Sequence, residues 1–428
     1  MRLLLSGLVI LYLCCGILFL ALPQRRRLAP LVRRAPSFVL ALGSLLLLGQ
    51  IGQPPSLEVR WIPLVEPAAL EHGAMAIYIS VMVCWALCWA HFSDVAASPP
   101  EKDTGFWTGL SYIACGVAIA ALTVNQFIVR VALLDVLALA VLILLVLYAL
   151  PSVFSLKALQ QFLLLRLGDL ALLFMVLVLW RFSGTFHIDT ALSATTMAAP
   201  GQRALLLFSG LLAVGVKMGV PPFDSWVRTT TDLPWGMGTW VVGATLPLLG
   251  AYLLYRLQIL LISPYVLGAL ALLGVLYVVM GIGWLGREGT ERSDRFVAAL
   301  TIHGGLGLLL CGTGAMGAYV LSFLPLRMVL GWVWRSRQLS VSMRAEPAPR
   351  PLNGLTRVNR AVAMRTGPLL ETSSFNRVID RVMEGVLRFG GLLQRAHTGQ
   401  LHTYVLWVTV VLVGVVLSAA LLALSGGV

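Results

Sequence analysis

Charged side chains are scarce in this chain. Only 11% of its 428 residues are Asp, Glu, Lys or Arg, whereas soluble domains carry about 25%. Hydrophobic residues make up 59% of the sequence, and the mean hydropathy is +0.90. A chain this apolar cannot present a polar surface to water on all sides. The composition therefore excludes an ordinary soluble domain and predicts a protein that faces the lipid bilayer.

Acidic residues are fewer than basic residues in this chain. The chain has 18 Asp and Glu residues against 31 Lys and Arg, which gives a formal net charge of +13. In a soluble protein this excess would indicate binding to nucleic acid. Here the basic residues lie in loops between apolar runs, where they orient a membrane protein in the bilayer. We therefore expect lipid as a partner and no nucleic acid.

Motifs for metals, cofactors and catalysis are also lacking. All six cysteines lie inside apolar runs, and none has histidine or cysteine neighbours at the spacing of a metal site. We find no nucleotide-binding glycine loop, flavin motif, haem-ligand pair or cluster-binding cysteine set. The sequence predicts no metal, no cofactor and no catalytic centre, and nothing supports redox chemistry within this chain.

Long apolar runs are abundant. A membrane-spanning helix needs about 20 apolar residues, and about twelve such runs follow one another along the chain. The first has the basic start of a signal peptide, but no small-x-small cleavage site precedes the arginine cluster at 25–27, so we expect a retained helix. The predicted fold class is an all-α, polytopic transmembrane helix bundle with one broken helix. The predicted spans are 3–22, 36–53, 72–92, 105–124, 127–150, 161–182, 203–223, 236–256, 263–286, 296–313, 315–335 and 403–425.

The loops indicate which side of the membrane they face. The first loop holds a cluster of arginines, whereas the second is acidic and contains one basic residue, Arg60. Residues 336–400 are rich in arginine and poor in acids. The positive-inside rule places the first loop and residues 336–400 in the cytoplasm, and the chain in the inner (cytoplasmic) membrane. The loop residues concerned are Arg25, Arg26, Arg27, Arg33, Arg34, Glu58, Glu66 and Glu71.

Composition divides the chain into five parts. Residues 1–104 hold the N-terminal transmembrane helices, and residues 105–335 hold the core of the bundle. Residues 336–372 contain prolines among scattered arginines, which is typical of a solvated linker. In residues 373–399 apolar side chains repeat every three or four positions with arginines opposite, which predicts an amphipathic lateral helix on the membrane surface or a partner subunit. An interfacial helix without a partner is the alternative, and residues 400–428 hold the C-terminal transmembrane helix.

Ionisable side chains inside a membrane span are costly and are therefore functional candidates. Lys217 follows an apolar run and precedes Pro221 and Pro222, which remove backbone donors and break the helix. Broken helices in membrane proteins often line ion pathways, and a desolvated lysine can exchange a proton there. The alternative is a lysine that extends to the membrane interface. The candidates are Asp135, Arg166, Asp169, Lys217, His303 and Arg327.

Asp135 lies in an otherwise apolar run and would take up a proton unless it is paired. Lys217 and Arg166 are its candidate partners. A carboxylate–lysine pair that opens and closes is a simple proton gate, because the lysine keeps its proton when the pair is closed and releases it when the pair is open. The alternative is a static ion pair that fixes the packing of the helices.

The other candidates fit structural roles as well as conduction. Arg166 and Asp169 are three residues apart and can pair with each other or with a neighbouring helix. This pattern fits a structural clamp between helices as well as it fits a role in conduction. His303 precedes two glycines, where close helix packing favours a hydrogen-bonded histidine over a relay. Arg327 stays charged in proteins, so it cannot easily pass protons, but it can set the field for a neighbour.

In combination, these residues resemble the antiporter-like subunits of respiratory complex I (NADH–quinone oxidoreductase) and their relatives in multisubunit cation/proton antiporters. Lys217, Pro222 and Trp226 keep the spacing of the family's broken seventh helix. Asn125 leads an apolar run to Asp135, where the family has a glutamate. The resemblance implies a proton-translocation core in residues 105–335 and a conducting role for the buried carboxylate and lysine.

Two further matches narrow the resemblance. Residues 166–169 match the family's Arg-x-Gly-Asp sequence, which lies on its sixth helix. Residues 397–399 and Tyr404 follow the amphipathic segment, as a similar turn and last span follow the lateral helix of the largest of these subunits. The chain is therefore most similar to that largest subunit, the chain L type, in a divergent and shortened form.

The chain also departs from the family pattern. Val242 stands where the eighth helix normally has a histidine, and Arg327 aligns with a later lysine. Tyr319 and Phe323 fall near the histidines that usually precede that lysine. Several spans before the C-terminal helix are lacking. The resemblance thus implies that the input half of a proton relay is kept and that the output half is lost.

Three functions are consistent with this pattern. The first is a proton- or cation-translocating subunit of a multisubunit, energy-converting complex like NADH–quinone oxidoreductase, driven by a quinone-reducing module through other membrane subunits. The second is the membrane component of an inorganic-carbon uptake complex, since a related branch of the family pairs with a soluble carbonic-anhydrase-like protein. The third is a non-conducting structural subunit of the same fold.

Overall fold

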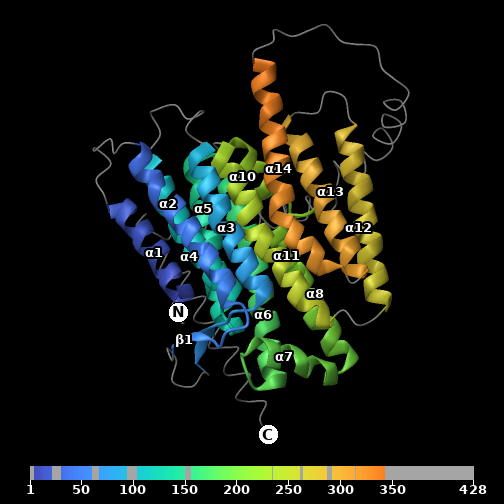
Figure 1. The fold of residues 1–428 in the computed structure, drawn as a ribbon. Helices are drawn as coiled ribbons and strands as arrows, with labels where there is room; N and C mark the ends of the chain where they lie inside the picture. The colour runs from blue at the N-terminus through green and yellow to red at the C-terminus, as the bar shows by residue number, and fades with distance from the viewer. Residues whose placement is uncertain are drawn as a thin grey trace, which may run out of the picture. The chain divides into compact units, whose positions relative to one another are not determined.

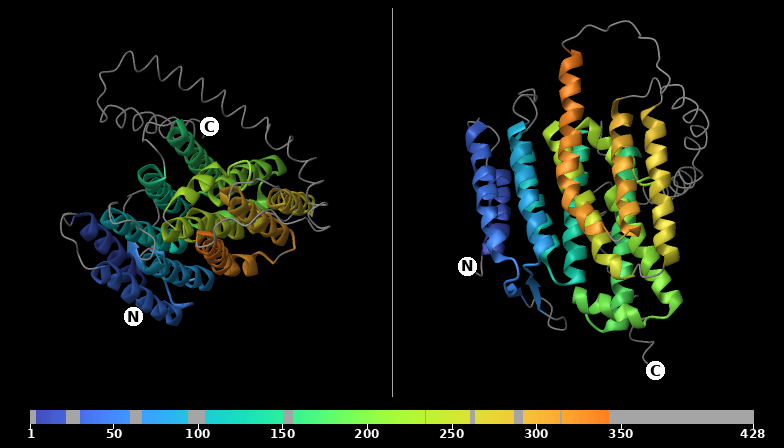
Figure 2. Two further views of the ribbon diagram at one scale, coloured as in Figure 1. Left: turned by 90° about the horizontal axis from the view of Figure 1, so that it is seen from above. Right: turned by 45° about the vertical axis from the view of Figure 1, so that its right-hand side comes forward.

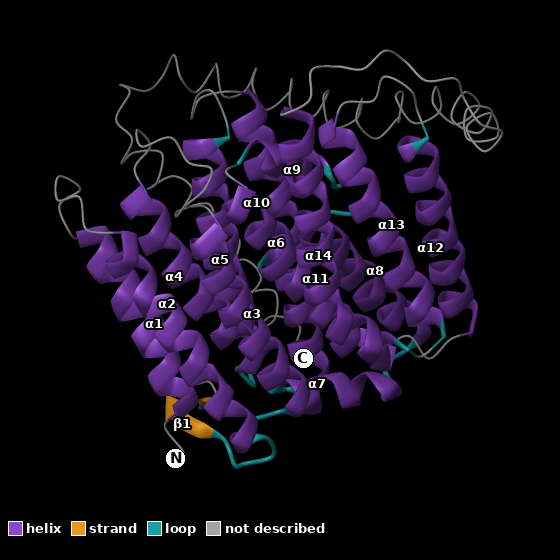
Figure 3. Cartoon of the chain, turned by 45° about the horizontal axis from the view of Figure 1, so that its top comes forward, coloured by secondary structure: helices purple, strands orange, loops and turns teal. Residues whose placement is uncertain are grey.

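The described part of the chain is a bundle of long helices (Figure 1). Every described residue belongs to one compact unit, Met1–Thr366. The sheet found among these residues is a two-stranded antiparallel hairpin of β1 (Ser56–Val59) and β2 (Ala68–Leu70), and helices dominate the remainder (Figure 3). The computed structural model describes residues 4–21, 30–59, 67–93, 104–149, 156–233, 235–260, 264–286, 292–313 and 315–342.

The helices confirm the predicted all-α polytopic class. Among the described residues, 9 helical segments are long and apolar enough to cross a membrane, and Arg34–Gln50 and Met316–Leu330 are shorter apolar segments. Together they account for every predicted span except 403–425, which lies outside the described residues. The helices are α1 Leu4–Ala21, α2 Pro30–Ser44, α3 Ala74–Ser93, α4 Thr104–Thr123, α5 Phe127–Tyr148, α6 Leu156–Ser183, α7 Ile188–Ala194, α8 Pro200–Met218, α9 Ser225–Thr229, α10 Trp235–Ala244, α11 Leu246–Arg256, α12 Pro264–Leu285, α13 Arg292–Gly312 and α14 Met316–Ser342.

Proline marks several helix boundaries. Pro30, Pro200 and Pro264 open α2, α8 and α12, because the first turn of a helix has no use for the N–H that proline lacks. α14 continues through Ser342, so residues 336–342 of the predicted linker are helical. The rest of that linker, the predicted lateral helix and the predicted C-terminal span lie outside the described residues.

A second helix break, which the sequence analysis did not predict, interrupts the span expected at 236–256. α10 ends at Ala244, α11 begins at Leu246, and Thr245 between them has φ −111° and ψ −128°. Pro247 near the start of α11 lacks the N–H that a continuous helix would need there. The Thr245 hydroxyl donates to the carbonyl oxygen of Val241, which satisfies one group that the break leaves free.

Helix neighbours bring distant parts of the sequence together. α6 packs against α5 and α8, α11 packs against α8, and α14 packs against α10 and α13. α12 and α13 lie side by side at one edge of the bundle (Figure 2). The six candidate residues from the sequence therefore lie on helices that touch.

The β1–β2 hairpin and α7 cover one end of the bundle, and the C-terminal end of α14 lies at the other (Figure 1). Leu70 forms an isolated bridge with Val124, and Gln126 forms another with His187. These bridges tie the hairpin, the α4–α5 turn and the α6–α7 loop into one cap. The predicted orientation would place this cap outside the cell.

Candidate functional site

The break after α8 is built by glycine, proline and tryptophan. Gly219 adopts a left-handed conformation, with φ +65°, and a Cβ there would lie 2.1 Å from Val227 Cγ2, so only glycine fits. Pro221 and Pro222, joined by a cis peptide bond, follow and prevent the helix from continuing. The Trp226 indole donates across the break to the carbonyl oxygen of Val216 at 2.9 Å. The predicted broken helix is therefore present, and its free carbonyl has a partner.

Lys217 lies in the last turn of α8, directly before this break. Its side chain is buried, and its Nζ lies 2.5 Å from Oδ1 of Asp169, which is also buried. Burial of a charge is strongly unfavourable unless the charge is paired and hydrogen-bonded. The two residues therefore form an interior ion pair, and Lys217 does not extend to the membrane interface.

Two glycines let this pair form. A Cβ on Gly168 would lie 2.7 Å from Val216 Cγ1, and a Cβ on Gly250 would lie 3.2 Å from Lys217 Cβ and 2.9 Å from Met218 Cγ. Because these residues are glycine, α6 and α11 approach α8 more closely than side chains would allow. Gly168 is the neighbour of Asp169 in the chain, so it brings that carboxylate directly to the lysine.

Arg166 extends the pair towards α5. Its Nη1 forms an ion pair with Oδ1 of Asp135 and lies 3.7 Å from Oδ2 of Asp169. The Asp135 side chain is 36% exposed, whereas that of Lys217 is 2% exposed. The four groups alternate in charge from a carboxylate that faces outward from α5 to an ammonium in the interior. We call Asp135, Arg166, Asp169 and Lys217 the charge chain.

The structure settles which candidates pair. Of the two partners predicted for Asp135, it selects Arg166 and not Lys217. The lysine instead takes Asp169, a partner that the sequence analysis did not consider for it. The physical reason is the close approach of α6 to α8 at Gly168, which the spacing of residues along one helix does not reveal.

His303 and Arg327 form a separate buried group. Arg327 Nε donates to His303 Nδ1 at 3.2 Å, and its Nη1 donates to the carbonyl oxygen of Val242 at 2.9 Å. Its guanidinium lies 4.3 Å from the centre of the Phe323 ring, and the Tyr319 hydroxyl donates to the His303 carbonyl oxygen at 3.1 Å. The residues that depart from the family pattern therefore meet at one place.

Asp224 and its partners are polar groups that the sequence analysis missed. Asp224 lies just after the break and accepts hydrogen bonds from Arg228 on α9 at 2.8 Å. Arg228 also pairs with Asp294 at the start of α13, at 2.7 Å. The spacing of four between Asp224 and Arg228 was the signal available in the sequence. This triad ties α9 to α13.

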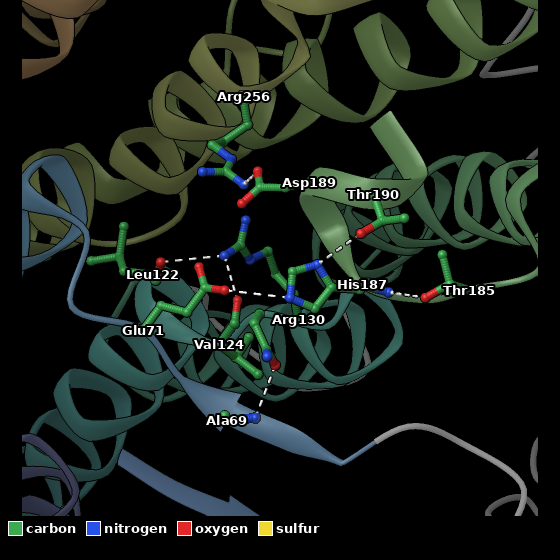
Figure 4. A network of polar contacts seen from close by, with 11 residues as sticks. Ala69, Glu71, Leu122, Val124, Arg130, Thr185, His187, Asp189, Thr190 and Arg256 are labelled. Carbon is green, nitrogen blue, oxygen red and sulfur yellow. Dashed lines mark hydrogen bonds and ion pairs between the residues drawn. The ribbon is translucent and has the colours of Figure 1, made fainter. Parts of the chain in front are cut away.

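Arg130 was also missed, although an arginine inside a predicted span is itself a signal. It is buried on α5, and its Nη2 donates to the carbonyl oxygens of Val124 at 2.6 Å and Leu122 at 3.3 Å (Figure 4). Its guanidinium lies 5.6 Å from the centre of the Tyr252 ring. Arg130 thus holds the α4–α5 turn at the capped end of the bundle.

A histidine–carboxylate contact and an ion pair surround Arg130 at this end (Figure 4). His187 lies 3.5 Å from Glu71, and Arg256 pairs with Asp189. They connect the segment after β2 to the α6–α7 loop, and α11 to α7. These side chains are all partly or largely exposed, so each pair adds little stability by itself. These contacts hold the cap in place over α5 and α11.

No group of three or more histidine, cysteine or acidic residues with the geometry to hold a metal occurs in the part of the chain that the structure describes. Cys84, Cys88, Cys115 and Cys311 are buried and form no disulfide. This agrees with the interpretation of these cysteines as small apolar side chains.

Comparison with known protein families places the site within one matched region. Residues 125–334 match the family described as NADH:quinone oxidoreductase/Mrp antiporter, TM. The matched range includes the charge chain, the broken helix, His303 and Arg327. No curated protein matches the chain in sequence.

Solved membrane complexes share the fold. The Mrp complex from Dietzia sp. DQ12-45-1b matches 85% of this chain with a TM-score of 0.71 and 17% identity. The membrane-bound sulfane sulfur reductase, an archaeal respiratory membrane complex, matches 79% with a TM-score of 0.63 and 15% identity. This chain spans 40% of the first matched chain and 57% of the second. The TM-scores show a common fold, and at identities this low the similarity shows the fold alone.

Proposed function

Since residues 125–334 make this chain an antiporter-like membrane subunit of the NADH:quinone oxidoreductase/Mrp family, we propose that it moves protons, or another monovalent cation, across the membrane. The observation that carries this proposal is the buried Lys217–Asp169 pair beside a broken helix. A lysine at such a position can be either paired with a carboxylate or unpaired. Its affinity for a proton is higher when it is paired, because the negative charge favours the ammonium form.

The charge chain provides a way to change between these two conditions. Its two carboxylates and two cations formally cancel, so a proton taken up at Asp135 leaves it with an excess positive charge. Protonation of Asp135 also removes the ion pair with Arg166. Arg166 is then free to turn to Asp169, whose Oδ2 is already within 3.7 Å.

Movement of Arg166 weakens the hold of Asp169 on Lys217. A buried ammonium that loses its counter-charge is costly, so release of the lysine proton restores the balance of charge. Loss of the proton from Asp135 draws Arg166 back and lets Lys217 be protonated again. Over one full cycle Asp135 and Lys217 each take up one proton and release one. The cycle moves a proton across the membrane when Lys217 is reprotonated from the side opposite to the one that received its proton.

Proton flux in vesicles that hold the purified native complex tests this proposal. Lys217→Met removes the titratable group but keeps an unbranched side chain of similar length. Arg203→Met is the matched control, because Arg203 lies on the same helix but at its first turn. We expect flux to collapse in Lys217→Met and to persist in Arg203→Met at equal assembly. Unchanged flux in Lys217→Met would contradict the proposal.

A non-conducting structural subunit is the second candidate. The observation that favours it is Arg327, which stands where the family has a lysine and cannot release a proton. If the route is vestigial, Lys217→Met leaves flux unchanged in an intact complex, and the main effect of changes at the site is on assembly. The same measurement therefore separates the two candidates.

We further propose that the chain acts with other membrane subunits, because the solved relatives belong to an Mrp complex and a respiratory membrane complex. Purification of the native complex tests which partners are present. Quinone-reductase subunits would support an energy-converting complex, whereas a carbonic-anhydrase-like zinc protein would support inorganic-carbon uptake.

The proposed location is the inner (cytoplasmic) membrane, with the basic segment 336–400 in the cytoplasm. Single cysteines introduced at residue 345 and at residue 66 test it, because the predicted topology places them on opposite sides. Labelling of residue 345 by a membrane-impermeant thiol reagent in intact cells would contradict this orientation.

A further inference from the structure

Arg327 is a buried cation for which the described residues supply no acidic partner. It is 2% exposed, and within the described part of the chain no carboxylate lies close enough to form an ion pair with it. Its contacts are a ring nitrogen of His303, the carbonyl oxygen of Val242 and the face of Phe323. These are dipoles and a ring quadrupole, which stabilise the positive charge without cancelling it.

The hydrogen bond from Arg327 sets the protonation of His303. A guanidinium nitrogen can only donate, so His303 Nδ1 must accept, and the ring proton must lie on Nε2. Nε2 has no hydrogen-bond partner among the described residues. A second proton on the ring would break the bond to Arg327 and place two cations side by side. His303 is thereby held in one neutral tautomer.

This positive group lies directly behind the helix break. A Cβ on Gly304, the neighbour of His303, would lie 2.6 Å from Val220 Cγ1, and Val220 follows Lys217 by three residues. The charge chain on one side of the break is formally neutral, whereas the Arg327–His303 group on the other side carries one fixed positive charge. A cation that moved from Lys217 towards α13 and α14 would approach this charge.

We propose that Arg327 is a fixed positive barrier that closes the path from Lys217 towards α13 and α14 to protons and other cations. Arginine cannot relay a proton, and Arg327 holds His303 in a form that does not accept one. This inference rests on the proposed function, because it concerns where protons released by Lys217 can go. They must leave without passing His303.

Passive proton permeability of vesicles that hold the native complex, measured without any driving reaction, tests the barrier. Arg327→Met removes the charge and frees His303 Nδ1, whereas Arg327→Lys keeps the charge and is the matched control. We expect permeability to rise about tenfold in Arg327→Met, because removal of a buried unit charge lowers the electrostatic barrier to a cation, and a tenfold change corresponds to about 1.4 kcal/mol. Permeability should rise less in Arg327→Lys than in Arg327→Met, because lysine keeps the charge although it can exchange a proton.

The double variant Lys217→Met, Arg327→Met tests whether the rise in proton permeability uses the path from Lys217. If the barrier lies on the path from Lys217, the rise disappears in the double variant. A rise that persists there, or no rise in Arg327→Met at equal assembly, overturns the inference. Loss of driven flux in Arg327→Met to the level of Lys217→Met also overturns it, because Arg327 would then be part of the route.

A spectroscopic measurement tests the histidine independently of transport. Nitrogen NMR of histidine-labelled complex, with His303→Gln to assign the signal, should show a bare Nδ1 and a protonated Nε2. A cationic His303 in the wild-type complex would overturn the inference. Failure of the proposed function has a different signature, which is driven flux that does not change in Lys217→Met.

Discussion

Alanine at position 168 should separate the two helices that hold the buried ion pair. A Cβ there would lie 2.7 Å from Val216 Cγ1 and 2.9 Å from Val216 Cβ, whereas carbon atoms in contact lie about 3.5–4.0 Å apart. Val216 is buried and β-branched, so it has little freedom to turn aside, and α6 and α8 must part by roughly 1 Å. Lys217 Nζ would then move from 2.5 Å to about 3.5 Å from Asp169, beyond a strong hydrogen bond.

Two effects of Gly168→Ala can be measured. Overpacking of a tight helix contact costs about 1–3 kcal/mol, so the Tm of the complex in detergent should fall. Proton flux in vesicles should fall roughly tenfold if about 1.4 kcal/mol is added to the limiting step. Gly268→Ala on α12 is the matched control, because nothing lies within 4 Å of a Cβ built at that position.

A second change identifies the steric cause. Val216→Ala, added to Gly168→Ala, removes the contact at 2.7 Å but leaves the Val216 Cβ at 2.9 Å, so we expect flux to recover in part. If Gly168→Ala has the same flux and Tm as Gly268→Ala, the reasoning is refuted, and the glycine does not set the length of the ion pair.

Three further changes have defined outcomes. Trp226→Phe removes the indole donor to the Val216 carbonyl oxygen and leaves a void, so unfolding should become easier by about 1–3 kcal/mol in thermal or denaturant unfolding. Asp135→Asn releases Arg166 permanently and should lower proton flux roughly tenfold or more without loss of assembly; unaltered flux would exclude Asp135 from the route. Burial lowers the pKa of His72, which precedes α3, so the fold favours its neutral form, and stability should decline as the pH falls below the ordinary value of 6.5. His72→Gln should reduce this decline when Tm is followed from about pH 8 to about pH 5.

The sequence identified the charged residues of the site and the contacts of Arg166 with Asp135 and Asp169, but not the pairing of Lys217 with Asp169. Lys217, Asp169 and Arg166 stand out because charge is rare in apolar helices. Which of them meet depends on how closely α6 approaches α8, and that is decided by the side-chain volume at Gly168. Periodicity reports which residues share a face of one helix and contains no information about the depth of contact between two helices.

The break after α8 was predictable, whereas the break at Thr245 was not. Pro221 and Pro222 are consecutive prolines at the end of an apolar run, which is a strong stop signal. A single proline at 247 lies inside a run that is apolar on both sides, so composition favours one continuous span. Arg130 was predictable in principle, because it is a lone arginine in an apolar run, and only its partners required the fold.

Arg166 determines what kind of transfer the charge chain can perform. A guanidinium keeps its proton under physiological conditions, so in the proposed cycle the proton that arrives at Asp135 is never the proton that leaves Lys217. The two ends are coupled by a change in the position of the Arg166 side chain. No proton is passed along the charge chain from Asp135 to Lys217. The guanidinium lies 5.5 Å from the centre of the Phe162 ring, so the contact with that ring changes when Arg166 turns. Deuterated water should therefore slow the two ends of the cycle and leave the middle step unaffected.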